Sequence, residues 1–179
     1  MKKEPKKEDI IYLAGIMDAD GYFTIKRNTY GVRVIKDCKN PRYSEKVGIK
    51  QTSNKAIKII YQYFGGYYRL EKPTAKNGKP LYAVSLECLK AHEFVKAVYP
   101  YLRIKKQQAE ILLQLRESIN RGRTKRLEYI KKTKSGKLVE MVVYAINDDE
   151  IRLRENLIKK VKRLNDSRND VTHQPIPWK

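Results

Sequence analysis

Apolar residues fill the stretch from Ile10 to Ala19 so densely that little polar surface remains, and Asp20 and Gly21 follow directly. The spacing predicts a helix that begins at Asp9 as its N-cap and ends at Gly21. A surface helix normally keeps one polar side, so we expect this helix to be buried on both faces. A carboxylate at the tip of such a helix is costly unless a cation or hydrogen-bond donors meet it. Asp20 is therefore a candidate functional residue.

Alternating apolar and polar side chains predict four strands, over residues 22–37, 42–51, 67–72 and 79–88. Turns are expected at Asn40-Pro41 and at Asn77-Gly78, between paired strands. Helical spacing predicts a second helix capped by Thr52 or Ser53, a third that stops before Pro100, and a fourth over residues 105–120. The second helix is expected to bury Ile57, Ile60, Tyr61 and Phe64.

This order of elements predicts an α+β domain in which helices cover one face of a four-stranded sheet. Residues 1–8 are expected to be a charged arm, and residues 9–120 the compact core. A basic extension follows over residues 121–179, with a hairpin that turns at Ser135-Gly136 and a helix over residues 148–164. Hydrophobic residues make up 41% of the 179-residue chain, enough for one core.

The charge of the chain favours a polyanionic partner. Lys and Arg number 40 against 20 Asp and Glu, a formal net charge of +20, which indicates nucleic acid first and an anionic membrane surface second. No apolar run approaches the ~20 residues of a membrane-spanning helix, and no secretory signal is present, so we expect an intracellular protein, cytoplasmic or organellar, without a membrane partner. The early part of the extension is expected to contact phosphates through Arg121, Arg123, Lys125 and Arg126.

Histidine and cysteine chemistry is hard to build here, because the chain has only two of each, His92 and His173, and Cys38 and Cys88. Carboxylate chemistry is favoured instead. Gly15 and Ala19 lie four residues apart on one side of the first helix, where small side chains let another helix approach closely. The simplest partner is the same helix of a second copy, related by a two-fold axis. Two such helices would bring two Asp20 carboxylates together, and the repulsion between them would call for divalent cations such as Mg²⁺.

The segment from Leu13 to Gly21 resembles the signature of the LAGLIDADG homing endonucleases, matching seven of its nine letters, with Ile16 and Met17 as apolar substitutes. The resemblance extends over roughly residues 9–120. Gln51 closes the second strand where the family commonly has a polar residue, and the stretch 101–109 is similar to the segment that carries the family's active-site lysine, here matched to Lys105. Lys55 falls where some members place a basic residue.

The resemblance implies a saddle-like DNA-binding sheet and a homodimer, since the chain has a single motif. It also implies site-specific cleavage of both strands of a long, pseudo-palindromic DNA target with Mg²⁺, leaving short 3′ overhangs. Asp20 of each subunit would bind Mg²⁺, and a water activated by the metal would attack the phosphodiester. Gln51, Lys105 and Lys55 would complete the catalytic group, and Asp18 would be structural. The dimer interface would include Leu13, Gly15, Ile16 and Ala19.

The polar face of the predicted sheet is the candidate surface for reading bases, because a two-stranded ribbon fits the major groove. A slip of one residue would invert every assignment. By alternation, the outward residues are Thr24, Lys26, Asn28 and Tyr30 on the first strand, Arg42, Ser44 and Lys46 on the second, Tyr67, Arg69 and Glu71 on the third, and Lys79 at the start of the fourth.

Two other interpretations stay open at this point. One is a non-cutting nucleic-acid binder of similar fold, such as an intron RNA-splicing maturase or a DNA-binding regulator, although such a protein has no use for a carboxylate aimed at phosphates. The other is a basic ribosome-associated protein, which explains the charge but leaves the first helix unexplained.

Overall fold

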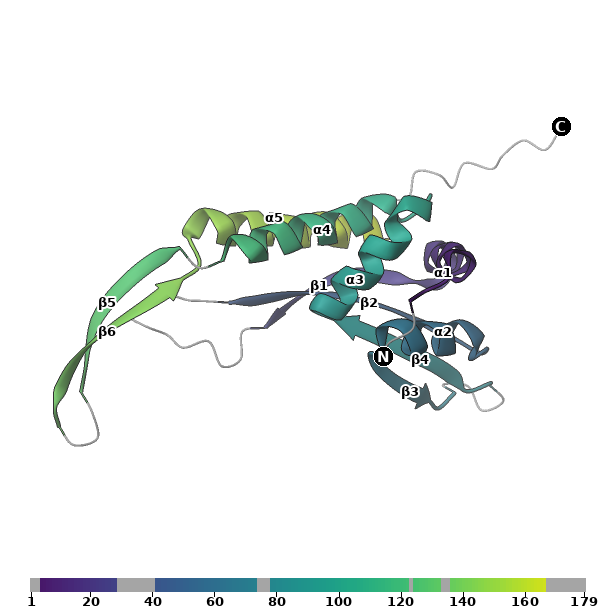
Figure 1. Cartoon of the computed structure of the whole chain (residues 1–179), viewed down its shortest axis with the longest axis horizontal. Coiled ribbons are helices and arrows are strands. Elements are labelled where there is room, and N and C mark those ends of the chain that lie inside the picture. Colours follow the sequence, from purple (N-terminus) through teal and green to yellow (C-terminus); the bar gives the residue numbers. More distant parts are fainter. Residues whose placement is uncertain (1–3, 29–40, 74–77, 123, 133–135, 167–179) are drawn as a thin grey trace.

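The structure of the chain is a computed structural model that describes residues 4–28, 41–73, 78–122, 124–132 and 136–166. The helices are α1 (Lys7–Asp20), α2 (Lys55–Phe64), α3 (Leu89–Val98), a 3-10 turn (Tyr99–Tyr101), α4 (Lys106–Arg121) and α5 (Asp148–Asn165). The strands are β1 (Tyr22–Asn28), β2 (Arg42–Gln51), β3 (Tyr67–Glu71), β4 (Leu81–Glu87), β5 (Lys125–Lys132) and β6 (Leu138–Ala145). This arrangement confirms the predicted α+β class (Figure 1).

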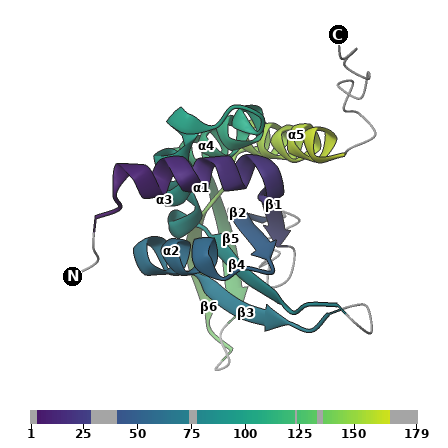
Figure 2. The same cartoon turned by 90° about the vertical axis from the view of Figure 1, so that its right-hand side faces the viewer.

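The body of the molecule is an antiparallel four-stranded sheet in the order β1-β2-β4-β3. Helices α1 to α4 contact it and α5 packs on α4 and β1, so the helices form one layer and the sheet the other (Figures 1 and 2). The inner face of the sheet supplies the core, with Phe23, Val47, Ile49 and Leu86 almost fully buried. No helix of the described ranges covers the opposite face, which we call the outer face.

A second sheet forms an arm. Strands β5 and β6 pair along their whole length as an antiparallel hairpin, and Figure 1 shows this hairpin extending away from the body. The chain then returns in α5, which runs beside α4. The Asn147 side chain begins α5 by accepting a hydrogen bond from the backbone N–H of Asp149 at 3.2 Å. The predicted hairpin and last helix are thus both present.

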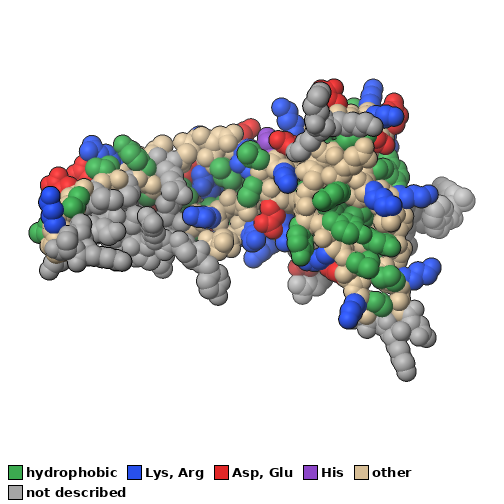
Figure 3. Space-filling view, turned by 60° about the horizontal axis from the view of Figure 1, so that its bottom comes forward, with side chains coloured by type: hydrophobic (Ala, Val, Ile, Leu, Met, Phe, Trp, Pro, Cys, Tyr) green, Lys and Arg blue, Asp and Glu red, His purple; other side chains and the backbone are tan. Residues whose placement is uncertain are grey.

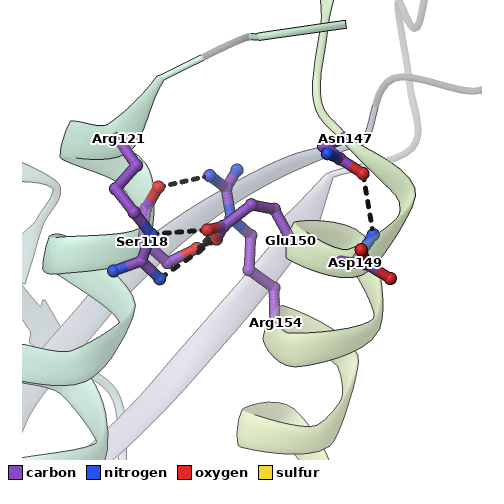
Figure 4. Close-up of polar contacts among 6 residues, drawn as sticks. All are labelled: Ser118, Arg121, Asn147, Asp149, Glu150 and Arg154. Atoms are coloured by element: carbon purple, nitrogen blue, oxygen red, sulfur yellow. Dashed lines mark hydrogen bonds and ion pairs between the residues drawn. The ribbon is translucent and has the colours of Figure 1, made fainter.

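The root of the arm is fixed by charged hydrogen bonds between α4 and α5 (Figure 4). Glu150 accepts from the Ser118 hydroxyl and from the Arg121 guanidinium. Arg154, which is buried, donates to the Ser118 hydroxyl and to the Ser118 carbonyl oxygen, each at 2.7 Å. Hydrogen bonds to charged groups are stronger than neutral ones, so these contacts set the position from which the arm leaves the body.

A buried ion pair joins the sheet to α4. Glu45 lies on the inner face of β2 with no exposed surface, and the Arg116 guanidinium of α4 donates to it, the Nε–Oε1 distance being 2.6 Å. The strand alternation predicts an apolar side chain at this position. A charge there is tolerated because its partner arrives in bidentate geometry.

Three local predictions were wrong. Helix α1 begins at Lys7 rather than after an Asp9 cap, and Asp9 instead accepts a hydrogen bond from the Tyr63 hydroxyl at 2.6 Å. Tyr61 was expected in the core but is 53% exposed, because the buried stripe of α2 passes through Tyr63. The N-cap of α2 is Asn54, without a side-chain bond, rather than Thr52 or Ser53.

Strand ends also differ from the prediction. Strand β4 begins at Leu81, so Lys79 precedes it in the connection. Strand β1 is described only to Asn28, and the predicted continuation to residue 37 lies outside the described residues, as does the C-terminal tail. Among the helices that the structure describes, none combines the length and the apolar character needed to cross a membrane.

Strand β3 is an edge strand with much exposed apolar surface. Tyr67, Tyr68 and Leu70 are 44–65% exposed, and the Tyr68 ring stacks on Tyr82 and meets Tyr61 edge-on. Figure 3 shows hydrophobic side chains gathered at the end of the body away from the arm, with Lys and Arg side chains around them. The sheet therefore ends in an aromatic border at β3.

The buried pair yields the first prediction. Replacing Arg116 by Met leaves the fully buried Glu45 carboxylate without its partner, so the free energy of unfolding should fall by about 3–5 kcal/mol. Urea denaturation followed by circular dichroism measures this. The double variant Glu45→Leu/Arg116→Met removes both charges and should recover most of the loss. A single variant as stable as the parent would contradict the role assigned to the pair.

Candidate functional site

Asp20 is the last residue of α1, and its side chain is exposed to solvent. Gln51, the last residue of β2, donates a hydrogen bond from its Nε2 to the Asp20 Oδ2 at 2.8 Å. The amide orients the carboxylate, and no described residue donates a hydrogen bond to the other oxygen, Oδ1. Two residues that lie 31 positions apart in sequence, both predicted as site residues, are thus in direct contact.

Asp18 links α1 to the beginning of α4. Its two carboxylate oxygens accept hydrogen bonds from the backbone N–H groups of Arg103 at 2.8 Å and Lys105 at 2.9 Å. Both of its oxygens are therefore engaged within the chain. The two bonds hold the segment before α4 against the end of α1, which agrees with the structural role expected for Asp18.

Lys105 lies beside the end of α1. Its Nζ donates to the carbonyl oxygen of Gly21 at 2.7 Å and to that of Ala19 at 3.1 Å, where a cation complements the negative end of the helix dipole. Partial burial lowers the pKa of Lys105, while the carboxylates of Asp18 and Asp20 oppose that shift. The structure therefore brings Asp20, Gln51 and Lys105 together around one helix terminus.

Lys55, the fourth predicted catalytic residue, begins α2 with an exposed side chain. Its backbone N–H donates to the Ser53 hydroxyl at 3.4 Å. Within the described part of the chain, its ammonium group makes no hydrogen bond or ion pair with Asp20 or Gln51. Lys55 is near in sequence to Gln51 but is not part of the bonded group.

One side of α1 is open. Ile11 and Tyr12 are each 46% exposed, and Ala19 is exposed as well. Apart from its two chain neighbours and the nearby backbone of α1, no atom of the described residues lies within 4 Å of the position where a Cβ on Gly15 would stand, so another backbone has room to approach there. Ile16 is half-buried at the border of this stripe.

The prediction that Leu13 belongs to this open side was wrong. Leu13 is fully buried in the core of its own chain, because the face of α1 that packs on the sheet also contains Ala14 and Met17. Ile11 and Tyr12 were missed, although their spacing of four and three residues to Gly15 placed them on its side of the helix.

The register of the sheet places the predicted outward residues on its outer face. Thr24 lies opposite Lys46, Lys26 opposite Ser44, and Asn28 opposite Arg42. On the far strand, Tyr67, Arg69 and Glu71 share this face. Tyr30 lies outside the described residues, and Lys79 is exposed in the connection before β4.

The outer face also includes Tyr22, Lys50 and Glu87, which were not among the predicted site residues. The same alternation could have found each of them. Tyr22 lies opposite Gly48, and a Cβ on Gly48 would collide with the Tyr22 ring and with the Val84 carbonyl oxygen. The glycine therefore makes room for the tyrosine ring on this face.

The residues of the extension that were predicted to contact phosphates differ from one another in their surroundings. The Arg121 guanidinium is bound to Glu150 at the root of the arm, and Arg126 on β5 forms an exposed ion pair with Glu128 at 2.8 Å. Lys125 is the first residue of β5, and Arg123 lies outside the described residues.

Between the arm root and the outer face is a hollow of about 460 Å³, bordered by Lys26, Arg42, Glu87 and Cys88 among others.

Comparison with solved structures identifies proteins of similar fold. The homing endonuclease I-CvuI in complex with its target superposes with a TM-score of 0.58 at 17% sequence identity, covering 89% of this chain and 83% of that one. The archaeal intron-encoded homing endonuclease I-Vdi141I, complexed with DNA, gives a TM-score of 0.58 at 14% identity, covering 89% and 86%. No protein-family model matches the sequence, and no curated protein does.

The chain has the fold of the LAGLIDADG homing endonucleases. In this LAGLIDADG fold the nine-residue segment that resembles the signature forms the second half of α1 and the residue after it, with Asp20 at the tip. Gly21 follows under steric constraint, since a Cβ there would lie 2.7 Å from the Met17 backbone. The order of strands and helices over residues 9–120 agrees with the sequence prediction.

A single chain offers few protein ligands for a hard cation at the helix tip. No cluster of three or more His, Cys, Asp or Glu side chains occurs in the described ranges. Asp20 offers oxygen ligands of the kind that Mg²⁺ prefers, but a single chain supplies one such carboxylate. Asp18 already accepts a backbone hydrogen bond on each carboxylate oxygen, which favours a structural role for it.

The two carboxylates of α1 should behave oppositely on substitution. Asp18→Ala removes the acceptor for two backbone N–H groups and should lower the free energy of unfolding by about 1–2 kcal/mol, as loss of a helix cap does. Asp20→Ala, the matched control, removes only an exposed contact with Gln51 and should change stability by less than about 0.5 kcal/mol. Urea denaturation of both variants checks this, and equal losses would contradict the division of roles.

Proposed function

We propose that this chain is a homodimeric, Mg²⁺-dependent, site-specific DNA endonuclease that cuts both strands of a long, pseudo-palindromic duplex and leaves short 3′ overhangs. The observation that carries the proposal is the exposed Asp20 carboxylate at the end of α1, oriented by Gln51 and flanked by Lys105. A protein that needed α1 only for packing would gain nothing from an exposed carboxylate at this tip. The likeness to I-CvuI and I-Vdi141I, each solved with DNA, supports the same assignment.

The open side of α1 supports a dimer. Ile11, Tyr12, Gly15 and Ala19 form an exposed stripe of apolar and small residues along a helix whose other side is core. Packing this stripe on its copy about a two-fold axis would bury it and bring the two helix ends together. Each partner would then contribute one Asp20.

Magnesium fits the pair of carboxylates that such a dimer would create. Mg²⁺ takes few protein carboxylates and completes its octahedron with waters and substrate phosphates. One structure of I-CvuI was determined in the presence of 2 mM Mg, with its DNA not cleaved. When bound, the metal supplies Lewis-acid chemistry and charge neutralisation at the scissile phosphate.

The chain's own residues have separate tasks in this proposal. Asp20 would hold the cation, and Gln51 keeps the carboxylate in one orientation through its 2.8 Å hydrogen bond. Lys105 holds positive charge beside the site, where it would stabilise the negative charge that develops on the phosphate in the transition state. Lys55, exposed at the start of α2, would add positive charge near the same phosphate.

The outer face would carry the DNA. It presents Lys26, Arg42, Lys46 and Arg69 with polar residues between them, on a sheet that leaves this side free of helices. Arg pairs bidentately with guanine, and Asn, here Asn28, with adenine. The basic residues of the extension would contact phosphates, which strengthens binding without reading sequence.

The catalytic assignment is tested by carboxamide substitution. Because Asp20→Asn removes the metal ligand, it should reduce cleavage of a site selected from a random duplex library in Mg²⁺ by more than about 100-fold. Binding of the same site should persist, because the outer face is unchanged. Cleavage in a gel assay and binding by fluorescence anisotropy are the measurements. Asp149→Asn, the same change at an exposed position on α5, is the control and should cleave normally.

Two outcomes would contradict the proposal. Full activity of Asp20→Asn would exclude Asp20 as the metal ligand. The parent protein could also bind the duplex without nicking it in Mg²⁺, as it does in EDTA. The chain would then be a non-cutting binder such as an RNA-splicing maturase or a regulator.

The dimer is tested at Gly15. Gly15→Leu should leave the monomer folded, because no described residue beyond the local turns of α1 lies within 4 Å of the new Cβ, but it should block the close approach of two α1 helices. Sedimentation velocity should show a dimer for the parent and a monomer for the variant. Gln114→Leu, at an exposed position on α4, controls for added surface hydrophobicity and should stay dimeric. A dimeric Gly15→Leu variant would place the interface elsewhere.

A further inference from the structure

Two glutamates lie among the cations of the outer face. Glu87, the last residue of β4, contacts the Lys26 ammonium on β1 at 3.2 Å and the Lys46 ammonium on β2 at 3.3 Å. Lys46 lies directly opposite Glu87 in the register, and Lys26 reaches it across β2. One carboxylate therefore holds cations from two other strands.

Glu71 makes the same arrangement at the β3 side of the sheet. It contacts the Lys50 ammonium on β2 at 2.9 Å and accepts from the Arg69 Nε at 2.6 Å. Lys50 and Arg69 both lie opposite Ala83 of the intervening strand β4. The small side chain of Ala83 lets this contact pass over β4.

Both carboxylates remain ionised at neutral pH. Hydrogen bonding to Lys50 lowers the pKa of Glu71. Burial raises the pKa of Glu87, but hydrogen bonds from Lys26 and Lys46 outweigh it and the pKa is lowered overall. The outer face thus carries two fixed negative charges in a surface whose other charged residues, among those described, are Lys26, Arg42, Lys46, Lys50 and Arg69.

Negative charges on a protein surface weaken its binding to DNA of any sequence. Each cation that meets a phosphate releases counterions and adds affinity that does not depend on sequence. A carboxylate between two lysines lowers this attraction and holds both ammonium groups in one place. Specificity is a difference of affinities, and it grows when the wrong sequences are bound less well.

We propose that Glu71 and Glu87 are specificity-determining residues, which suppress sequence-independent DNA binding and fix Lys26, Lys46, Lys50 and Arg69 at the positions where they meet base edges. This inference rests on the proposed function, because it requires that the outer face binds duplex DNA.

Isosteric amides test the inference. Glu87→Gln and Glu71→Gln, made separately, should each bind a random-sequence duplex on the order of 3- to 10-fold more tightly than the parent. The slope of log affinity against log salt concentration should also become more negative, by about 0.9 for each additional phosphate contacted. Fluorescence anisotropy across a KCl series measures both quantities. The pairs are partly exposed, and loss of such pairs costs little stability, so both variants should fold.

Glu110→Gln is the matched control, since it makes the same charge change at an exposed position on α4, among the helices. Its affinity for the random duplex should change by less than about twofold. Equal gains for Glu110→Gln and the two outer-face variants would overturn the inference, because net charge alone would explain them. Unchanged affinity in Glu87→Gln and Glu71→Gln would overturn it as well.

Failure of the proposed function gives a different result. A parent protein that does not bind the random duplex even at low salt would refute DNA binding itself, and with it this inference. Binding by the parent without a response to the glutamate substitutions refutes only the inference.

Discussion

The candidate site depends on the two hydrogen bonds that Asp18 accepts from the backbone of Arg103 and Lys105. They join the end of the first helix to a segment 85 and more residues later, and they leave the Lys105 side chain beside the carbonyl groups of Ala19 and Gly21. Asp20, by contrast, is exposed, and within the described part of the chain its side chain accepts a hydrogen bond from Gln51 alone. One carboxylate builds the site, and the other is available to act in it.

Ion pairs serve two purposes in this molecule, according to their place in the fold. On the helical side, Glu45 and Arg116 join sheet to helix in the core, and Glu150, Ser118 and Arg154 fix the root of the arm. On the outer face the pairs are partly exposed and contribute little to stability. They also weaken the attraction of this surface for the polyanion that the proposed function requires it to bind, which is why we assign them to selectivity.

The sequence predicted the elements and the face of each strand, because periodicity reports which side chains are buried. Asp20, Gln51 and Lys105 were matched through the resemblance, and the contacts among them depend on how α1, β2 and α4 meet, which no local pattern gives. Glu45 could not be foreseen, since a charge in a buried strand position is stable only with Arg116, 71 residues later. Leu13 was assigned to the dimer interface because the sequence of an almost wholly apolar helix does not show which of its faces is buried. In the structure Leu13 lies in the core, and Ile11 and Tyr12 lie on the open side.

The central claim is that two copies of Asp20 share divalent metal over one DNA duplex. The most direct measurement is anomalous scattering from Mn²⁺ in crystals of the protein bound to a DNA site selected from a random library. The account predicts metal about 2.1 Å from Asp20 oxygens of both subunits, next to a phosphate. Metal bound elsewhere, or Asp20 residues too far apart to share a site, would contradict it.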